Sequence, residues 1–244
     1  MNFLEKIDIS KDIINVFTID LRVLETYLPK LITYLSDEEK IQAHNFLFEY
    51  LKSRYIASHG FLRILLGKYL SCSPSQVEYT YTEFQKPLCK NNPNLHFNMS
   101  HSHEYACYAF SFNHEVGIDI EFMNPKIETN DLLSIVTTPE EMFIFDKLDQ
   151  NDKFYAFYKT WTIKEAFLKA LGIGLSHSLS NIETTILPRE RFGVIRCDDI
   201  PEKELAKEWT FSPIISLSNY LGAIAVKKKE AHINMISLDS LKFL

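Results

Sequence analysis

Three acidic residues in two separate segments have the types and spacing for metal chemistry. Asp119 and Glu121 alternate with isoleucines in residues 116–121. Side chains two positions apart on a β-strand share a face, so these carboxylates would lie side by side, roughly 7 Å apart at the backbone. Like charges this close raise each other's pKa unless a cation lies between them, and a hard divalent ion is the natural candidate. The alternative is a strand edge whose acids are solvated, which is the more common outcome for an isolated Asp-x-Glu.

The third acid, Glu165, falls within the apolar stripe of a helix predicted over residues 153–171. A bare carboxylate is costly there unless it is paired or bound to a metal. Lys169, four residues on, could supply an ordinary ion pair worth about a few tenths of a kcal/mol. In the functional interpretation Glu165 meets the two strand acids across a cleft as a third oxygen ligand. Magnesium held by three acids beside Lys164 and Lys169 would suit a diphosphate substrate.

A polar run, Ser100-His101-Ser102-His103, precedes the acidic strand and reads as part of a polar loop over residues 97–104. A serine-hydrolase site is disfavoured because no Gly-x-Ser-x-Gly pattern surrounds the serines. The two histidines could bind zinc, but no further Cys or His lies at ligand spacing. A phosphate-holding role fits better, since histidine and serine both offer hydrogen-bond donors to anionic oxygens.

Periodicity and capping signals predict the elements that must position these residues. Ser36 and Thr138 each begin a helix with a glutamate three residues later, and Gly172 ends the helix that carries Glu165. The segments predicted to be helical are 37–48, 51–70, a region beginning at 132–136, the helix that begins at Thr138, and 153–171. The segments predicted to be strands are 15–21, 77–81, 105–112, 116–121, 182–186, 209–215 and 220–226.

The order helix, strand, loop, strand recurs in both parts of the chain, and both long helices end in Leu-Gly. We therefore expect an α+β fold of two similar halves packed face to face, residues 1–115 and 116–244, with a cleft between them. Chance similarity between common supersecondary elements is the alternative explanation.

The composition of the chain excludes several classes of function. The 244 residues are 46% hydrophobic, enough for a full core, and the net charge of −6 argues against a nucleic-acid partner. No apolar run approaches the ~18 residues of a membrane span, and no signal peptide is evident. The four cysteines are scattered without the spacing of zinc or redox motifs. We expect a reduced, cytoplasmic protein with no membrane partner.

Three blocks resemble, in order and spacing, the signature of the Sfp-type 4′-phosphopantetheinyl transferases. They are Phe97-Asn98-Met99-Ser100-His101-Ser102, Val116-Gly117-Ile118-Asp119-Ile120-Glu121, and Trp161-Thr162-Ile163-Lys164-Glu165-Ala166 with Lys169. Gln85-Lys86-Pro87 resembles the Gly-Lys-Pro that precedes the first block in that family. The likeness covers roughly residues 36–226, and three blocks in order are specific where each alone is weak.

The resemblance implies a pseudo-twofold monomer whose halves clasp coenzyme A, with magnesium on its diphosphate. By this match Asp119, Glu121 and Glu165 hold the metal. The residues that would contact the coenzyme A phosphates are Arg54, Lys86, Ser100, His101, Lys164 and Lys169.

The family transfers the phosphopantetheine arm to a serine of an apo acyl, peptidyl or aryl carrier protein, releasing adenosine 3′,5′-bisphosphate. Attack at a diphosphate phosphorus requires that its charge be neutralised and the serine proton removed. Glu165, or a metal-bound water that it orients, is the candidate base, and Lys169 could assist the leaving phosphate.

Two departures from the family pattern stand out. Gln85 replaces the usual glycine, and residues 39–42, where relatives often carry lysines for the 3′-phosphate, include only Lys40. Two other functions use the same residues: a metal-dependent phosphohydrolase acting on a diphosphate, and a non-catalytic module that binds carrier proteins.

Overall fold

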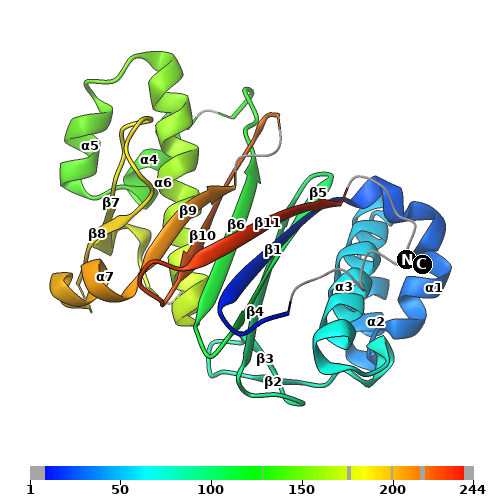
Figure 1. Cartoon of the computed structure of the whole chain (residues 1–244). Helices are drawn as coiled ribbons and strands as arrows, with labels where there is room; N and C mark the ends of the chain where they lie inside the picture. The colour runs from blue at the N-terminus through cyan, green and yellow to red at the C-terminus, as the bar shows by residue number, and fades with distance from the viewer. Residues whose placement is uncertain (1–8, 128, 175–176, 199, 215–217, 239–244) are drawn as a thin grey trace.

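Two β-sheets packed face to face divide the helices of this protein into two groups (Figure 1). The computed structural model describes residues 9–238 except 128, 175–176, 199 and 215–217. From one side to the other, the layers are the N-terminal helices, a four-stranded sheet, a three-stranded sheet, and the helices of the C-terminal half. The predicted α+β class is confirmed.

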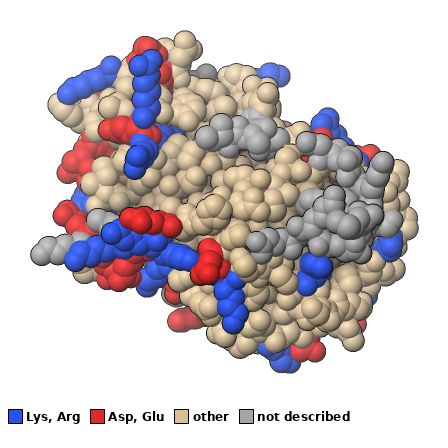
Figure 2. Space-filling model, viewed as in Figure 1, with Lys and Arg blue, Asp and Glu red and all other residues tan. Residues whose placement is uncertain are grey.

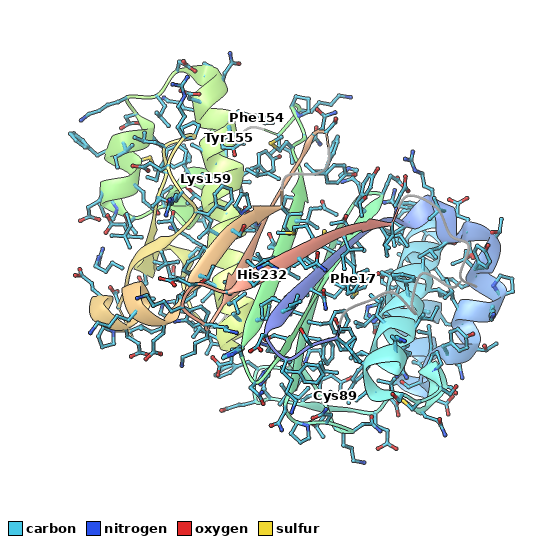
Figure 3. All side chains as sticks on the ribbon, in the orientation of Figure 1. Phe17, Cys89, Phe154, Tyr155, Lys159 and His232 are labelled. Carbon is cyan, nitrogen blue, oxygen red and sulfur yellow. The ribbon has the colours of Figure 1, made fainter. Side chains whose placement is uncertain are left out.

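The first sheet has the strand order β11-β1-β5-β4. Its pairings are antiparallel except that β11 runs parallel to β1. The 22-residue helix α3 covers its outer face, and Phe17 of β1, labelled in Figure 3, packs in the core that these elements share. The elements of this part are β1 (Ile13–Asp20), α1 (Leu28–Leu31), α2 (Asp37–His44), α3 (Glu49–Leu70), β4 (Leu95–Ser102), β5 (Tyr105–Phe112) and β11 (His232–Leu238).

The second sheet is antiparallel, in the order β6-β10-β9, and a second 22-residue helix, α6, covers its outer face. Each half therefore sets one long helix against one sheet. The elements of this part are β6 (Val116–Phe122), α4 (Asn130–Val136), α5 (Pro139–Phe145), α6 (Gln150–Leu171), α7 (Glu202–Glu208), β9 (Thr210–Ile214) and β10 (Tyr220–Val226).

Two small hairpins complete the described chain. They are β2 (Tyr79–Tyr81) with β3 (Pro87–Cys89), and β7 (Ile182–Thr184) with β8 (Val194–Cys197). Short 3₁₀ helices lie at Leu21–Tyr27, Ile32–Tyr34, Pro74–Gln76 and Leu179–Asn181. Among the helices of the described residues, none is both long and apolar enough to cross a membrane.

Small and branched apolar side chains fill the space between the two sheets. Ile118 and Ile120 of β6 meet Val16 of β1 and Ala109 of β5 in one buried cluster. Because strand residues alternate, Gly117, Asp119 and Glu121 face the other way, toward α6. The alternation that the sequence predicts therefore separates a dry face from the acidic face of β6.

Gly117 lets β6 approach α6 closely. A Cβ atom built at this position would lie 2.0 Å from the Ala166 carbonyl oxygen and 2.3 Å from the Ala170 nitrogen, which no side chain could tolerate. The close contact brings the acidic face of β6 against the last turns of α6, where Glu165 and Lys169 lie.

The predicted helix signals are confirmed. Ser36 and Thr138 each form a capping box with the glutamate three residues on, and Gly172 ends α6 in a left-handed conformation. The prediction of a polar loop at residues 97–104 is wrong, because β4 runs through Ser102 and pairs with β5 along its whole length. Its polar residues resemble a loop because they face a second strand rather than an apolar layer.

The expected division at residues 115 and 116 needs correcting at its C-terminal end. β11, which belongs to the second stretch of sequence, is a member of the first sheet. Asn234 of β11 donates a hydrogen bond to Asn15 of β1 at 3.0 Å. The two halves are therefore not contiguous segments, since the chain returns to the first half after completing the second.

Candidate active site

The Asp119 carboxylate is buried between the two halves, with 2% of the residue exposed. Its Oδ1 accepts hydrogen bonds from Lys169 Nζ on α6 at 2.6 Å and from Ser100 Oγ on β4 at 2.9 Å. Its Oδ2 is buried and has no hydrogen-bond partner among the described residues. A buried carboxylate oxygen without a partner is unfavourable in a finished site, so this oxygen is a candidate ligand atom.

Glu121, two residues further along β6, is half-buried and accepts a hydrogen bond from Ser102 Oγ at 2.9 Å. Burial and, to a smaller extent, the negative charge of Asp119 raise the pKa of Glu121 to about 7. The hydrogen bond from Ser102 and the charge of Lys169 act in the opposite direction. Negative charge therefore exceeds positive charge around the acidic face of β6.

Glu165 lies on α6, one turn before Lys169. Burial raises the pKa of Glu165, the charge of Asp119 raises it as well, and Lys169 lowers it. The simple ion pair between Glu165 and Lys169 is not the arrangement seen, because the Lys169 ammonium is bonded to Asp119 and Ser100. The negative charge of Asp119 therefore acts on an acid from a distant segment of the chain.

The residues fit a divalent cation without forming a finished cage for one. Within the described ranges, no three His, Cys, Asp or Glu side chains are close enough together to hold a metal ion as they stand. The unpartnered Asp119 oxygen and the raised pKa values of Glu121 and Glu165 are what an oxygen-ligand site lacking positive charge would show. Magnesium keeps several waters and uses few carboxylates, so two or three acids suffice.

Three further residues that were predicted to bind phosphate, Lys86, His101 and Arg54, lie on three different elements. Lys86 of the β2–β3 hairpin donates to the Val116 and Ala170 carbonyl oxygens across the junction of the halves, and burial lowers its pKa to about 8. His101 lies at the end of β4 with part of its side chain exposed. Partial removal of its ring from water, followed by the nearby positive charges, lowers its pKa. Arg54 of α3 is paired with Glu104 and lies over the Tyr50 ring at 5.2 Å.

The prediction that Lys164 binds coenzyme A is wrong. Its ammonium is fully buried and bonds to Glu141 Oε2 at 2.5 Å, Val136 O at 2.6 Å and Leu179 O at 3.0 Å. All three donors are used inside the C-terminal half. Neighbours on a helix point about 100° apart, so Lys164 faces away from the site while Glu165 faces it.

Comparison with known proteins shows the family. A family model described as the 4′-phosphopantetheinyl transferase superfamily matches residues 115–225, and one described as 4′-phosphopantetheinyl transferase, N-terminal, matches residues 24–113. The 4′-phosphopantetheinyl transferase HetI of Nostoc sp. is 32% identical over 219 residues, covering 88% of each chain. This chain belongs to the 4′-phosphopantetheinyl transferase family.

Two further relatives are more distant. The 4′-phosphopantetheinyl transferase Sfp of Bacillus subtilis is 27% identical over 158 residues, covering 64% of this chain and 69% of its own. Among solved structures, the holo-[acyl-carrier-protein] synthase of Thermotoga maritima covers 48% of this chain and 64% of its own, at 22% identity and a TM-score of 0.36. Proteins of the transferase family use coenzyme A as a substrate and generally depend on a divalent metal.

The residue before the hairpin lysine, Gln85, has a backbone conformation that glycine adopts most easily. Gln85 has φ 64°, in the left-handed region where a side chain is strained. Its N–H donates to the Thr82 carbonyl at 3.0 Å, and the Lys86 N–H donates to Thr82 Oγ1 at 3.1 Å. Gln85 thus keeps the turn that presents Lys86, although glycine would adopt it with less strain.

Residues 39–42, with Lys40 as their one lysine, include a residue with a structural role. Glu39 is buried, completes the capping box of α2, and accepts a hydrogen bond from Arg63 Nε at 2.6 Å. His59 Nδ1 lies 3.7 Å from the other Glu39 oxygen. Glu39 therefore anchors α2 to α3.

Sequence analysis missed the part played by β4. Ser100 is predicted to contact phosphate, yet its hydroxyl proton is directed to Asp119 and the residue is 8% exposed. Ser102 and Asn98, for which no role was predicted, also bond across to β6. The signal was present in the sequence, because three polar residues alternate at positions 98, 100 and 102 as they do on one face of a strand.

A small cavity of about 130 Å³ adjoins the acids. Its walls are Glu121 and a set of apolar and aromatic residues: Ile127, Leu132, Phe157, Tyr158 and Trp161. A larger cavity of about 790 Å³ lies elsewhere in the C-terminal half, near Tyr155 of Figure 3, and its lining includes none of the predicted site residues. The small cavity borders one of the acids, and a further cavity of about 550 Å³ borders Arg54 and Glu104.

Proposed function

We propose that this member of the family transfers the 4′-phosphopantetheine arm of coenzyme A to a serine hydroxyl of an apo carrier protein, with magnesium as the metal. The observation that supports it most strongly is the buried Asp119 carboxylate, which has Lys169 and Ser100 on one oxygen and no described partner on the other. Asp119 could thus bind a cation through its second oxygen, while Lys169, which is bonded to its first oxygen, could bind a phosphate.

Asp119, Glu121 and Glu165 would hold the magnesium ion in this proposal. When bound, the ion neutralises charge on the diphosphate of coenzyme A, which makes its phosphorus accessible to a nucleophile. Burial, followed by the negative charge of Asp119, raises the pKa of Glu121 to about 7, and such an ion would offset that charge.

The chain's own cations would hold the rest of the diphosphate. Lys169 reaches the site from α6, Lys86 from the β2–β3 hairpin, and His101 from the end of β4, so the substrate would be held by both halves of the protein. Arg54 would join them once a phosphate competes with Glu104 for its guanidinium. Because one chain supplies both walls, we expect the protein to act as a monomer.

Glu165 is the proposed base. It would accept the proton of the carrier serine as the serine oxygen forms its bond to the phosphorus that bears the pantetheine arm. The bond to the second phosphoryl group then breaks, and its electrons leave on the oxygen of adenosine 3′,5′-bisphosphate, which Lys169 would stabilise. A carboxylate whose pKa is raised by burial is a better proton acceptor at neutral pH than a solvated one.

Mass spectrometry provides the test. The full chain would be incubated with magnesium, coenzyme A and a panel of apo acyl, peptidyl and aryl carrier proteins, and each carrier would be examined for the added arm. We expect modification of at least one carrier, and none of a carrier whose acceptor serine is replaced by alanine.

Two control reactions separate the alternatives. Turnover of coenzyme A without any carrier would instead indicate a phosphohydrolase. Carrier binding without modification, and without a rise in melting temperature when magnesium and coenzyme A are added, would indicate a non-catalytic module, since a ligand that binds the native state stabilises it.

A further inference from the structure

Side chains of β4 bond to the free edge of β6 and join the two sheets. β4 and β6 are the outermost strands of their respective sheets, so the N–H groups on the open side of β6 have no strand to pair with. Three alternate polar side chains of β4 accept these hydrogen bonds instead. The contacts are Ile118 N to Asn98 Oδ1 at 2.8 Å, Ile120 N to Ser100 Oγ at 3.4 Å and Phe122 N to Ser102 Oγ at 3.1 Å.

The hydroxyl of Ser102 both accepts and donates a hydrogen bond. It accepts the proton of Phe122 N–H, and it donates its single proton to Glu121 Oε2 at 2.9 Å. Because the backbone contact fixes the position of the oxygen, the remaining proton can point in few directions, and Glu121 takes it. The orientation of the Glu121 carboxylate is therefore linked to the backbone of its own strand through a residue of the other half.

We propose that Ser102 is a positioning residue, which holds the Glu121 carboxylate in the orientation needed to receive the cation. This inference rests on the proposed function, because it concerns the same acids. Hydrogen-bond partners of ligating carboxylates fix the orientation of the ligand, and losing one typically weakens metal affinity about 10- to 100-fold.

Asn98 provides the comparison with a purely structural role. It makes the same kind of contact to β6 as Ser102, two rungs away, and in the described structure its side-chain oxygen bonds to Ile118 N–H and to no carboxylate. Removing Asn98 should weaken the junction of the two sheets without changing the environment of the acids. Removing Ser102 should do both.

The experiment measures magnesium binding directly. Magnesium chloride would be titrated into the full chain by isothermal calorimetry, with coenzyme A absent and then saturating, and melting temperatures would be recorded for each variant. We expect Ser102→Ala to raise the magnesium Kd by about tenfold or more. Ser102→Thr, which keeps the hydroxyl, should restore the Kd, while Asn98→Ala should lower the melting temperature and leave the Kd unchanged.

The outcomes distinguish the two hypotheses. If the wild-type chain binds no magnesium in either condition, the proposed function fails. If the wild-type chain binds magnesium and Ser102→Ala binds it equally well, the positioning role fails although the function stands. Should Ser102→Ala not fold, Ser102→Cys keeps the volume with a weaker donor, and a Kd equal to that of the wild-type chain would overturn the inference in the same way.

Discussion

The ammonium of Lys169 lies 2.6 Å from Oδ1 of Asp119, so a residue expected to bind phosphate and a residue expected to bind metal form one ion pair. The pair spans the contact between α6 and β6 that Gly117 permits. Lys169 is less buried than Asp119, with 28% of its side chain exposed, so its remaining donor capacity can reach a substrate while Asp119 stays in place.

Replacing Glu165 by glutamine should remove most of the activity without changing the fold. The amide keeps the size of the side chain but cannot accept the serine proton, and loss of a general base typically costs about 10²- to 10⁴-fold in rate. Carrier modification by mass spectrometry measures the loss, with circular dichroism as the test of folding. Undiminished modification by Glu165→Gln would contradict the assignment.

Replacing Lys164 by methionine should affect stability and not binding. Breaking the buried pair leaves Glu141 without its cation, which typically costs about 3–5 kcal/mol. Urea unfolding would show this, while the coenzyme A affinity of the folded protein should stay the same because the ammonium lies outside the site.

Lys229 offers the matched control. Its side chain is 65% exposed, so Lys229→Met should change the free energy of unfolding by no more than about 0.5 kcal/mol. A Lys164→Met protein of normal stability that binds coenzyme A poorly would restore the role first predicted for Lys164.

Replacing Gly117 by alanine should disturb the site by moving α6 away from β6. The new Cβ would overlap the backbone of α6, so the strand and helix must separate, and overpacking of this kind costs about 1–3 kcal/mol or more. We expect Gly117→Ala to lower both the urea midpoint and transferase activity. At Gly193 a Cβ would meet nothing closer than Thr185 Cγ2 at 3.9 Å, so Gly193→Ala should leave both unchanged.

Coenzyme A affinity should fall as the pH rises through about 8. Burial disfavours the charged form of Lys86 and lowers its pKa to about 8, so the ammonium is present below that pH and is lost above it. A phosphate contact made by the ammonium weakens accordingly. In Lys86→Arg the guanidinium stays charged, so its affinity should be flat from pH 7 to pH 9. Parallel profiles for the two proteins would exclude Lys86 from the phosphate site.

Much of this fold could be predicted from local signals. The alternation in residues 116–121, the capping residues Ser36 and Thr138, and the helix ended by Gly172 all appear where the pattern places them. These features depend on neighbours in the chain, which a sequence displays. The association of Glu165 with Asp119 was expected from the cost of a carboxylate in an apolar helix stripe and from the family resemblance, because local periodicity does not link the two segments.

The features that the sequence could not reveal depend on distant partners. Lys164 and Lys169 lie on the same helix and have the same chemistry, yet one bonds to Glu141 inside its own half and the other to Asp119 at the junction. The loop predicted at residues 97–104 is a strand because β5 and β6 lie on either side of it. Neither partner can be identified from local periodicity.

Figure 2 adds one observation about the surface on this side of the molecule. Acidic and basic side chains are interspersed there, and the broad central area over the strands carries few charges. The candidate site lies where β6, α6 and β4 meet, and its Asp119 is buried.

The pairing of β11 with β1 has a consequence for how the protein is made. Asn15 and Asn234, which bond across this pairing, are 219 residues apart in the chain. While the polypeptide is emerging from the ribosome, β1 can pair on one side only until residues 232–238 are translated. A nascent chain stalled before residue 232 would therefore leave one edge of β1 unpaired and open to association with other chains.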